Sequence, residues 1–259
     1  MSQGFYMIFR KLHPLRALAA FLLFYVCSFD ILSAPKLFVA KELQLKDSIP
    51  SEEEFSRSFE DPLPAMVSDA EGKRLIELAN CRDYLAVRDR ITGSDNEADY
   101  RVLLLQTVPC LAMALLKLSG TASQSALPED FLQYTDTSAY PASIWPTVSD
   151  DEHQRLEQTQ ATLQTVSEKK SLKQLNDETL QLEASDFGLR LTLLACADFD
   201  HDGWEDAAFR WEGYALHGSY SNARLVVLTR TSKDGPFREL VIESLLQQDQ
   251  TTLPVIKGQ

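Results

Sequence analysis

Residues 189–211 read LRLTLLACADFDHDGWEDAAFRW. Leucine stands at every second position from 189 to 193, before an acidic loop, and apolar side chains recur at every second position from 207 to 211, after it. Apolar residues at this period are typical of a strand with one buried face. The stretch therefore predicts two antiparallel strands joined by the acidic loop.

Aspartates occupy positions 1, 3, 5 and 9 of the loop: Asp198, Asp200, Asp202 and Asp206. Gly203 at position 6 permits a sharp turn, and Trp204 at position 7 offers a backbone carbonyl. A shell made only of oxygen atoms suits a hard cation such as calcium. Because the four acids repel one another without an ion, we expect calcium to form part of the fold. The alternative is an acidic hairpin tip that binds no ion.

The flanks of the loop exclude an EF-hand. Position 12 is Phe209 where an EF-hand has a bidentate glutamate, and both flanks have strand periodicity. Ala197–Phe209 instead resembles the calcium hairpin of FG-GAP and VCBS repeats. That resemblance implies side-chain ligands at the four aspartates and a carbonyl ligand at Trp204. The chain holds a single copy, so the propeller architecture of those repeats does not follow, since a propeller needs several blades.

Other candidate sites carry weaker signals. His201 is an extra ligand, half of a zinc site with Cys196, or a solvated residue at the tip. The segment 213–222, which contains His217, is either a binding loop beside the ion or a long hairpin loop. A secreted or periplasmic metal-dependent hydrolase that uses His217 or the acidic cluster is the rival function from another class.

The N-terminus has the pattern of an export signal. Arg10, Lys11 and Arg16 precede an apolar run at 17–29, which is shorter than the roughly 20 residues that a spanning helix needs. We predict a signal peptide over 1–34, with an uncleaved anchor or a lipoprotein at Cys27 as alternatives. After cleavage we expect no membrane span and an extracytoplasmic (periplasmic or secreted) protein.

The middle of the chain consists of three segments that differ in composition and pattern. Prolines and acids over 35–67 predict an extended or mobile segment. Capping signatures at Ser68 and Ser94 predict a helical subdomain over 68–120, with its second helix interrupted at Pro109. The composition of 121–148, rich in Ser, Thr, Pro and Ala, predicts a linker that lies against the body.

The C-terminal part carries the sheet. Ser149 with Glu152 predicts a polar surface helix to about residue 169, and the strand pattern follows it, so that 149–246 forms a helix plus the sheet. Residues 247–259 form a polar tail. The expected fold class is α+β, with a helical N-terminal half followed by an antiparallel β-sheet that holds the calcium-loop hairpin.

Three cysteines remain after the leader, an odd count in an oxidising compartment. Cys81 and Cys110 form the candidate pair. Two long helices turning near Gly93 would leave these cysteines several ångströms beyond disulfide reach unless Pro109 bends the second helix. Two buried helical thiols are therefore an equal alternative, and Cys196 is expected to be a packed thiol.

The charge of the chain excludes some partners. The 259 residues carry a formal net charge of −13, which repels phosphate backbones and anionic headgroups, so we expect no nucleic-acid partner. The sequence favours an exported, non-enzymatic calcium-binding interaction protein with an unknown protein or glycan partner. A stress or inhibitor protein whose helical half binds a partner is a further interpretation.

Overall fold

Two neighbouring strands flank the acidic loop, as the alternation predicts: β7 (Phe187–Ala197) precedes it and β8 (Asp206–Ala215) follows it. They pair antiparallel from Phe187↔Ala215 to Ala197↔Asp206. The computed structural model describes residues 35, 37–128, 131, 134–168 and 170–247. The signal peptide predicted for 1–34 and nearly all of the tail predicted for 247–259 lie outside these residues.

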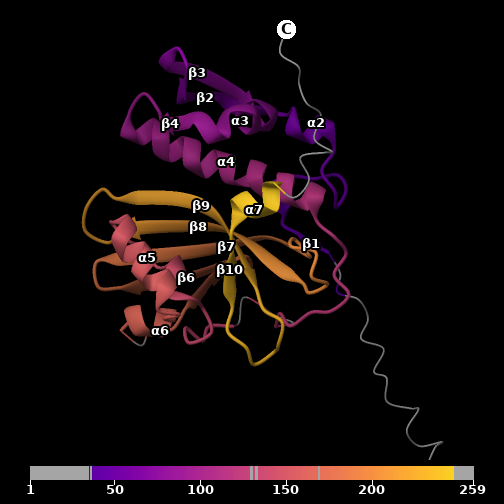
Figure 1. Ribbon diagram of the computed structural model, residues 1–259, viewed down its shortest axis with the longest axis vertical. Helices are drawn as coiled ribbons and strands as arrows, with labels where there is room; N and C mark the ends of the chain where they lie inside the picture. The colour runs from indigo at the N-terminus through magenta and orange to yellow at the C-terminus, as the bar shows by residue number, and fades with distance from the viewer. Residues whose placement is uncertain (1–34, 36, 129–130, 132–133, 169, 248–259) are drawn as a thin grey trace, which may run out of the picture. The chain divides into compact units, whose positions relative to one another are not determined.

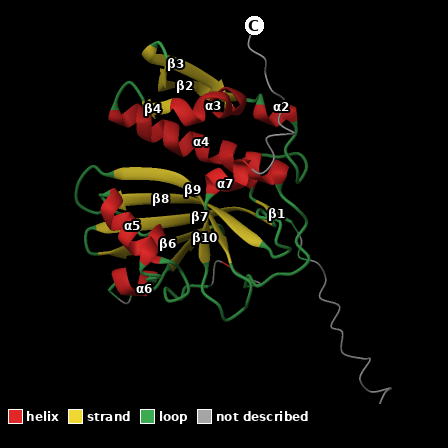
Figure 2. Ribbon diagram, viewed as in Figure 1, coloured by secondary structure: helices red, strands yellow, loops and turns green. Residues whose placement is uncertain are grey.

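The larger sheet has the order β10-β9-β8-β7-β6-β5, and β1 also pairs with β7 (Figure 1). All of its pairs are antiparallel. Its other strands are β1 (Phe38–Val39), β5 (Lys173–Asn176), β6 (Thr179–Ala184), β9 (Ser221–Thr229) and β10 (Arg238–Leu240). Together with the helices described below, this sheet confirms the α+β class (Figure 2).

Both faces of the larger sheet are buried, because alternate residues of its central strands face different cores. On one face, Leu191 and Phe209 join a core that includes the aromatic cluster of Phe131, Tyr140 and Phe237. On the other face, Ala208 and Val227 pack against α4 (Glu97–Leu118) and α7 (Ile242–Gln247). Strands covered on both sides read as nearly continuous apolar runs, as 225–228 does.

The first helix of the predicted subdomain, expected to begin at Ser68, is wrong. Residues 58–80 form a hairpin of β2 (Ser58–Asp69) and β3 (Gly72–Asn80), which β4 (Ile91–Gly93) extends to a three-stranded sheet. Alternate residues at 63, 65 and 67 are buried, whereas Leu75, one of the apolar residues at helical spacing in 75–85, is 47% exposed. Long-range pairing overrode a helical spacing of apolar residues. The predicted extended segment 35–67 accordingly contains most of β2.

Short helices complete this region. They are η1 (Lys41–Leu43), α2 (Glu52–Phe55), α3 (Cys81–Val87) and η2 (Arg88–Arg90). Asn80 caps α3 by accepting a hydrogen bond from the backbone N–H of Asp83 at 3.0 Å. The helix α3 is only seven residues long. The two long packed helices expected over 68–118 are therefore not found; a hairpin, the short α3 and α4 take their place.

The long helix α4 lies between the two sheets and contacts β2 on one side and β9 on the other (Figure 1). It passes through Pro109 without the predicted interruption. Proline removes one backbone hydrogen bond from a helix, and burial of α4 against both sheets offsets that loss. Within the described part of the chain, α4 is long and apolar enough to cross a membrane by length and composition alone. Its two-sided packing accounts for that composition.

The segment 121–148 lies against the body, as predicted, but its described residues belong to the core and do not form a linker. Tyr140, Ala142 and Ile144 are fully buried in the core of the larger sheet. The indole Nε1 of Trp211 on β8 donates a buried hydrogen bond of 2.6 Å to the carbonyl of Ile144, within η4 (Ala142–Ile144). The segment therefore covers one face of the sheet, although its composition resembles that of a loop.

The polar helix predicted from Ser149 is shorter than expected. Ser149 caps α5 (Asp150–Gln158) by accepting a hydrogen bond from the N–H of Glu152, which confirms the capping pair. The chain then turns and forms α6 (Leu163–Val166). Leu156 and Leu163 are buried in the sheet core, so these two helices extend the cover given by 121–148.

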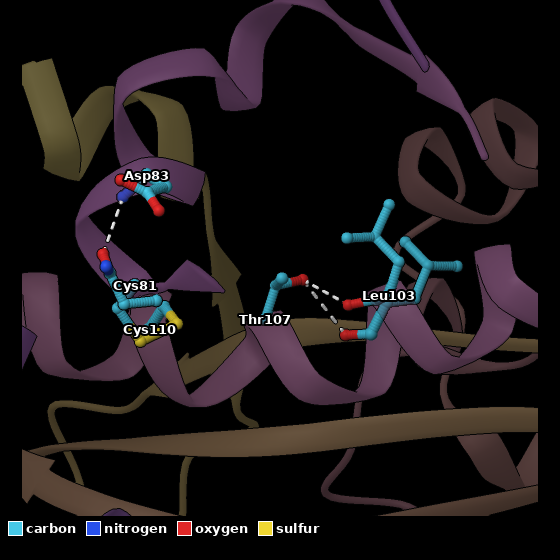
Figure 3. Close-up of a disulfide and its surroundings, with 7 residues drawn as sticks. Cys81, Asp83, Leu103, Thr107 and Cys110 are labelled. Atoms are coloured by element: carbon cyan, nitrogen blue, oxygen red, sulfur yellow. Dashed lines mark hydrogen bonds between the residues drawn. A yellow bond between two sulfur atoms is a disulfide. The ribbon is translucent and has the colours of Figure 1, made fainter. Parts of the chain in front are cut away.

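Cys81 and Cys110 form a disulfide with their Cα atoms 5.2 Å apart (Figure 3). The estimate that placed them out of reach assumed two long helices. Cys81 instead begins the short α3, which lies against the middle of α4. Two residues before Pro109, the Thr107 hydroxyl donates to the carbonyl of Leu103 at 2.7 Å. Cys196 is a buried free thiol, as expected.

Candidate metal centre

Side chains of the acidic loop accept hydrogen bonds from the loop's own backbone. The Asp200 carboxylate accepts a hydrogen bond from the N–H of Asp202 at 3.2 Å, and the Asp202 carboxylate accepts one from the N–H of Trp204 at 2.8 Å. Such contacts two residues along the chain stabilise tight turns. Gly203 has φ +89, a conformation that costs a residue without Cβ little. This agrees with its expected role at the turn.

Three aspartates converge. One carboxylate oxygen from each of Asp198, Asp200 and Asp206 lies within 4.8 Å of the other two, an arrangement that can hold a metal ion. Asp198 is 4% exposed and Asp206 is fully buried. The spacing of the sequence pattern is thus realised in space for three of its four acids.

In each of the two buried carboxylates, Asp198 and Asp206, only one oxygen accepts a hydrogen bond. Oδ2 of Asp198 accepts a hydrogen bond from the N–H of Gly203 at 3.0 Å, and Oδ2 of Asp206 accepts one from the N–H of Phe199 at 2.9 Å. Oδ1 of each is buried and makes no hydrogen bond of regular geometry, although the Thr229 hydroxyl is close enough to Asp206 to lower the pKa of that carboxyl in part. A buried charged oxygen without a full partner is costly. A cation bound by these carboxylates would remove that cost.

The other two expected ligands lie at the edge of the cluster. Asp202 is exposed and lies beside Asp200, outside the mutual group of three. Trp204 is half-buried and stands where the loop re-enters the body, in a bridge with Gln124. Neither residue is part of the converging group of carboxylates, and their roles as ligands remain predictions.

Burial perturbs the acids of the cluster. It raises the pKa of Asp206 from 3.8 to about 7, and the charges of Asp200 and Asp202 act in the same direction. Burial also raises the pKa of Asp200, to which the charges of Asp202 and Asp198 add. Without a cation, the folded protein therefore disfavours the ionised form of these carboxyl groups.

A distant segment holds the loop in place. The N–H of Gly120, just after α4, donates to the carbonyl of Asp198 at 2.8 Å. Ser123 and Gln124 donate from their N–H groups to the carbonyl of Gly203 at 3.0 and 3.1 Å. A Cβ at position 120 would lie 3.0 Å from Nδ1 of His201, so the close approach favours glycine. Sequence reasoning missed these residues, because they are far from the loop in sequence and no local pattern marks them.

The zinc alternative finds no support in the geometry. His201 is exposed, with its imidazole packed beside Gly120. Burial raises the pKa of the Cys196 thiol far above its usual range, with Glu205 and Asp206 adding to the shift. Zinc binds the thiolate, which this environment disfavours.

The loop that contains His217 is not beside the ion site. The acidic loop precedes β8, whereas residues 216–220 follow it. The ten residues of β8 separate the two loops by roughly 30 Å. Of the two alternatives for 213–222, the structure shows the hairpin loop, which joins β8 to β9, and not a loop beside the acidic cluster. Consecutive hairpin turns lie at opposite ends of a shared strand. The same distance means that His217 and the acidic cluster cannot belong to one site.

A small cavity lies next to the loop. It has a volume of about 80 Å³, and its lining includes Gly120, Cys196 and Glu205 but none of the three converging aspartates. Pockets that bury a substrate are typically several times larger. This cavity is therefore too small to bury a drug-sized ligand beside the loop.

Comparison of the chain with protein families, with curated proteins and with solved structures found no match. The resemblance to the calcium hairpin accordingly rests on the loop sequence and on the strand-loop-strand geometry. That geometry, together with the convergence of three carboxylates, is what the following proposal uses.

Proposed function

We propose that this chain is an exported, non-enzymatic interaction protein in which calcium, bound in the β7–β8 loop, stabilises the fold. The observation that carries the proposal is the convergence of the Asp198, Asp200 and Asp206 carboxylates, of which two are buried and each keep one oxygen without a hydrogen bond. Buried carboxylates in such a group are destabilising unless a cation lies among them.

The ligand chemistry supports calcium in particular. The three converging groups supply oxygen atoms only, and calcium takes six to eight oxygen ligands in flexible geometry. Asp202 and the carbonyl of Trp204 would add to this shell from the same loop. Magnesium demands near-ideal octahedral geometry and dehydrates reluctantly, so a loop of mixed carboxylates and carbonyls suits it less well.

Calcium in this position would fix more than the hairpin. The loop is hydrogen-bonded to residues 120–124, which follow α4 directly. Ordering the loop would therefore also anchor the C-terminal end of α4. In this proposal the ion connects the larger sheet to the helix between the two sheets, and the partner, a protein or a glycan, binds a surface that this connection keeps rigid.

Export is supported by one feature of the structure. Cys81 and Cys110 form a disulfide, and disulfides persist in oxidising compartments. This agrees with the leader expected over residues 1–34.

A thermal melt with and without calcium tests the proposal. Calcium at about one hundred times its Kd should add about 2.7 kcal/mol to the free energy of unfolding, which corresponds to a rise in Tm of about 5–10 °C over protein in chelator. The variant Asp177→Asn is the matched control, because Asp177 is an exposed aspartate at the β5–β6 turn of the same sheet. It should keep the full response. An unchanged Tm at millimolar calcium would refute the proposal.

A further inference from the structure

A second feature of the molecule is an apolar groove lined by residues of α2, α3, α4 and α7. Figure 1 shows where these four helices lie. It has a volume of about 220 Å³, below the roughly 300–1,000 Å³ of pockets that take drug-sized ligands. Its floor is made of apolar side chains: Phe55, Leu85, Ala86, Ala114, Leu118 and Leu246. The occupant that fits is therefore small and carries hydrocarbon.

Cations surround this floor. Arg82, Arg88 and Lys117 line the groove, and Glu52 is the only acid that lines it. Glu52 forms ion pairs with two of these cations: one carboxylate oxygen pairs with Lys117, and the other lies 3.2 Å from Nη2 of Arg82. Arg88 pairs outside the lining, with Asp89, whose side chain is 81% exposed. The lining thus has a net positive charge on a chain whose net charge is −13.

We propose that this groove binds a small amphiphilic carboxylate, an alkyl chain of medium length with one anionic end. The hydrocarbon would cover the apolar floor, and the carboxylate would lie between Lys117 and Arg82. Charge complementarity selects the anion, because the rest of the surface repels it while these two cations attract it. The groove residues lie outside the acidic loop, so this inference does not depend on the calcium proposal.

Glu52 has a defined part in this inference. In the free protein it occupies the two cations that the ligand would use. It therefore competes with the ligand carboxylate, and its removal should strengthen binding. A groove that attracted ligands by apolar contact alone would not respond in this way.

Titration calorimetry of the purified protein with decanoate, with and without calcium, tests the inference. We expect one site, with decanol binding roughly tenfold more weakly, because decanol lacks the charge-assisted contacts to Lys117 and Arg82. Decyltrimethylammonium should bind more weakly still, since its cation meets Lys117 and the two arginines. Equal binding of decanoate and decanol would contradict the proposal and indicate apolar adhesion, and no binding of decanoate at millimolar concentration would overturn it.

Two matched pairs of variants locate the site. Glu52→Gln should tighten decanoate binding several-fold, whereas Glu53→Gln, the same change on the next residue of α2, should not, because Glu53 is outside the groove. Lys117→Gln should weaken binding roughly tenfold. Its control is Lys46→Gln, which breaks the exposed ion pair with Glu53. Ala114→Phe should abolish binding by filling the floor. If Glu52→Gln and Ala114→Phe both bind decanoate like the unmodified protein, the groove is not the site.

Discussion

Protein with both Cys81→Ala and Cys110→Ala should lose about 3–4 kcal/mol of unfolding free energy. The disulfide joins cysteines separated by 29 residues, and closing a loop of that length removes this much conformational entropy from the unfolded chain. The loop encloses α3, η2, β4 and more than half of α4. The measurement is the denaturant midpoint and slope at fixed calcium, and the accompanying fall in Tm is roughly 10 °C.

Cys196→Ala is the control for this loss. Cys196 is buried and unpaired, so its replacement removes packing without opening a cross-link, and we expect a loss of about 1 kcal/mol or less. A reductant should destabilise the unmodified protein and the Cys196 variant, and it should leave the double variant unchanged. If all three respond alike, the cross-link has no stabilising role.

Asp198→Asn with Asp206→Asn should abolish the calcium response. Asparagine keeps an oxygen that can accept the hydrogen bond from the N–H of Gly203 or Phe199 but loses the negative charge that attracts the ion. The rise in Tm of about 5–10 °C expected for the unmodified protein should therefore vanish. In chelator, the double variant should be more stable than the unmodified protein at neutral pH, because two buried charges without a counter-ion are gone.

Relative to the unmodified protein, the double variant should be less stable in calcium and more stable in chelator. This combination distinguishes the loss of a metal site from a general loss of structure. A variant that merely misfolds would be less stable in chelator as well as in calcium. Asp177→Asn again serves as the control and should behave like the unmodified protein in both conditions. A double variant that still gains stability from calcium would place the ion elsewhere.

The calcium-free protein should become less stable as the pH rises from about 4 to about 7. The pKa of Asp206 is raised from 3.8 to about 7 in the folded state by burial, so the folded state binds more protons than the unfolded state in this window. Stability therefore falls with pH as the carboxyl group is forced to ionise. Asp206→Asn should flatten this slope, and saturating calcium should do the same. The measurement is the denaturant midpoint across this pH range, and a slope that is identical in the variant would exclude Asp206 as its source.

Local pattern was sufficient for the hairpin that carries the candidate site. Alternating apolar residues on both sides of a loop built from aspartates and one glycine predict two paired strands, because the pairing partners are neighbours in sequence. The turn is supported by contacts that span two residues, such as the one from Asp202 to the N–H of Trp204. The signals that predict this hairpin lie within residues 189–211, whereas its burial and the hold on its loop by residues 120–124 come from distant segments.

Predictions from local pattern were wrong where the packing partners are distant in sequence, or where the apolar residues of a strand happen to recur at helical spacing. The apolar residues of 75–85 recur at helical spacing, yet β3 forms because β2 offers a partner whose alternate residues are buried. The segment 121–148 has the composition of a linker but supplies Tyr140 and Ile144 to the core. In both cases the deciding contact is with residues that no short window of sequence contains.

The sequence by itself determined the acidic hairpin, the capped start of α5 and the α+β class, since each follows from propensities and hydrogen bonds between near neighbours. Tertiary structure alone decided that three aspartates converge, that Gly120 and its neighbours hold their loop, and that α3 lies where Cys81 meets Cys110. The reason is that burial and long-range pairing set the free energy of these contacts. A chain gains that free energy only when segments far apart in sequence come together.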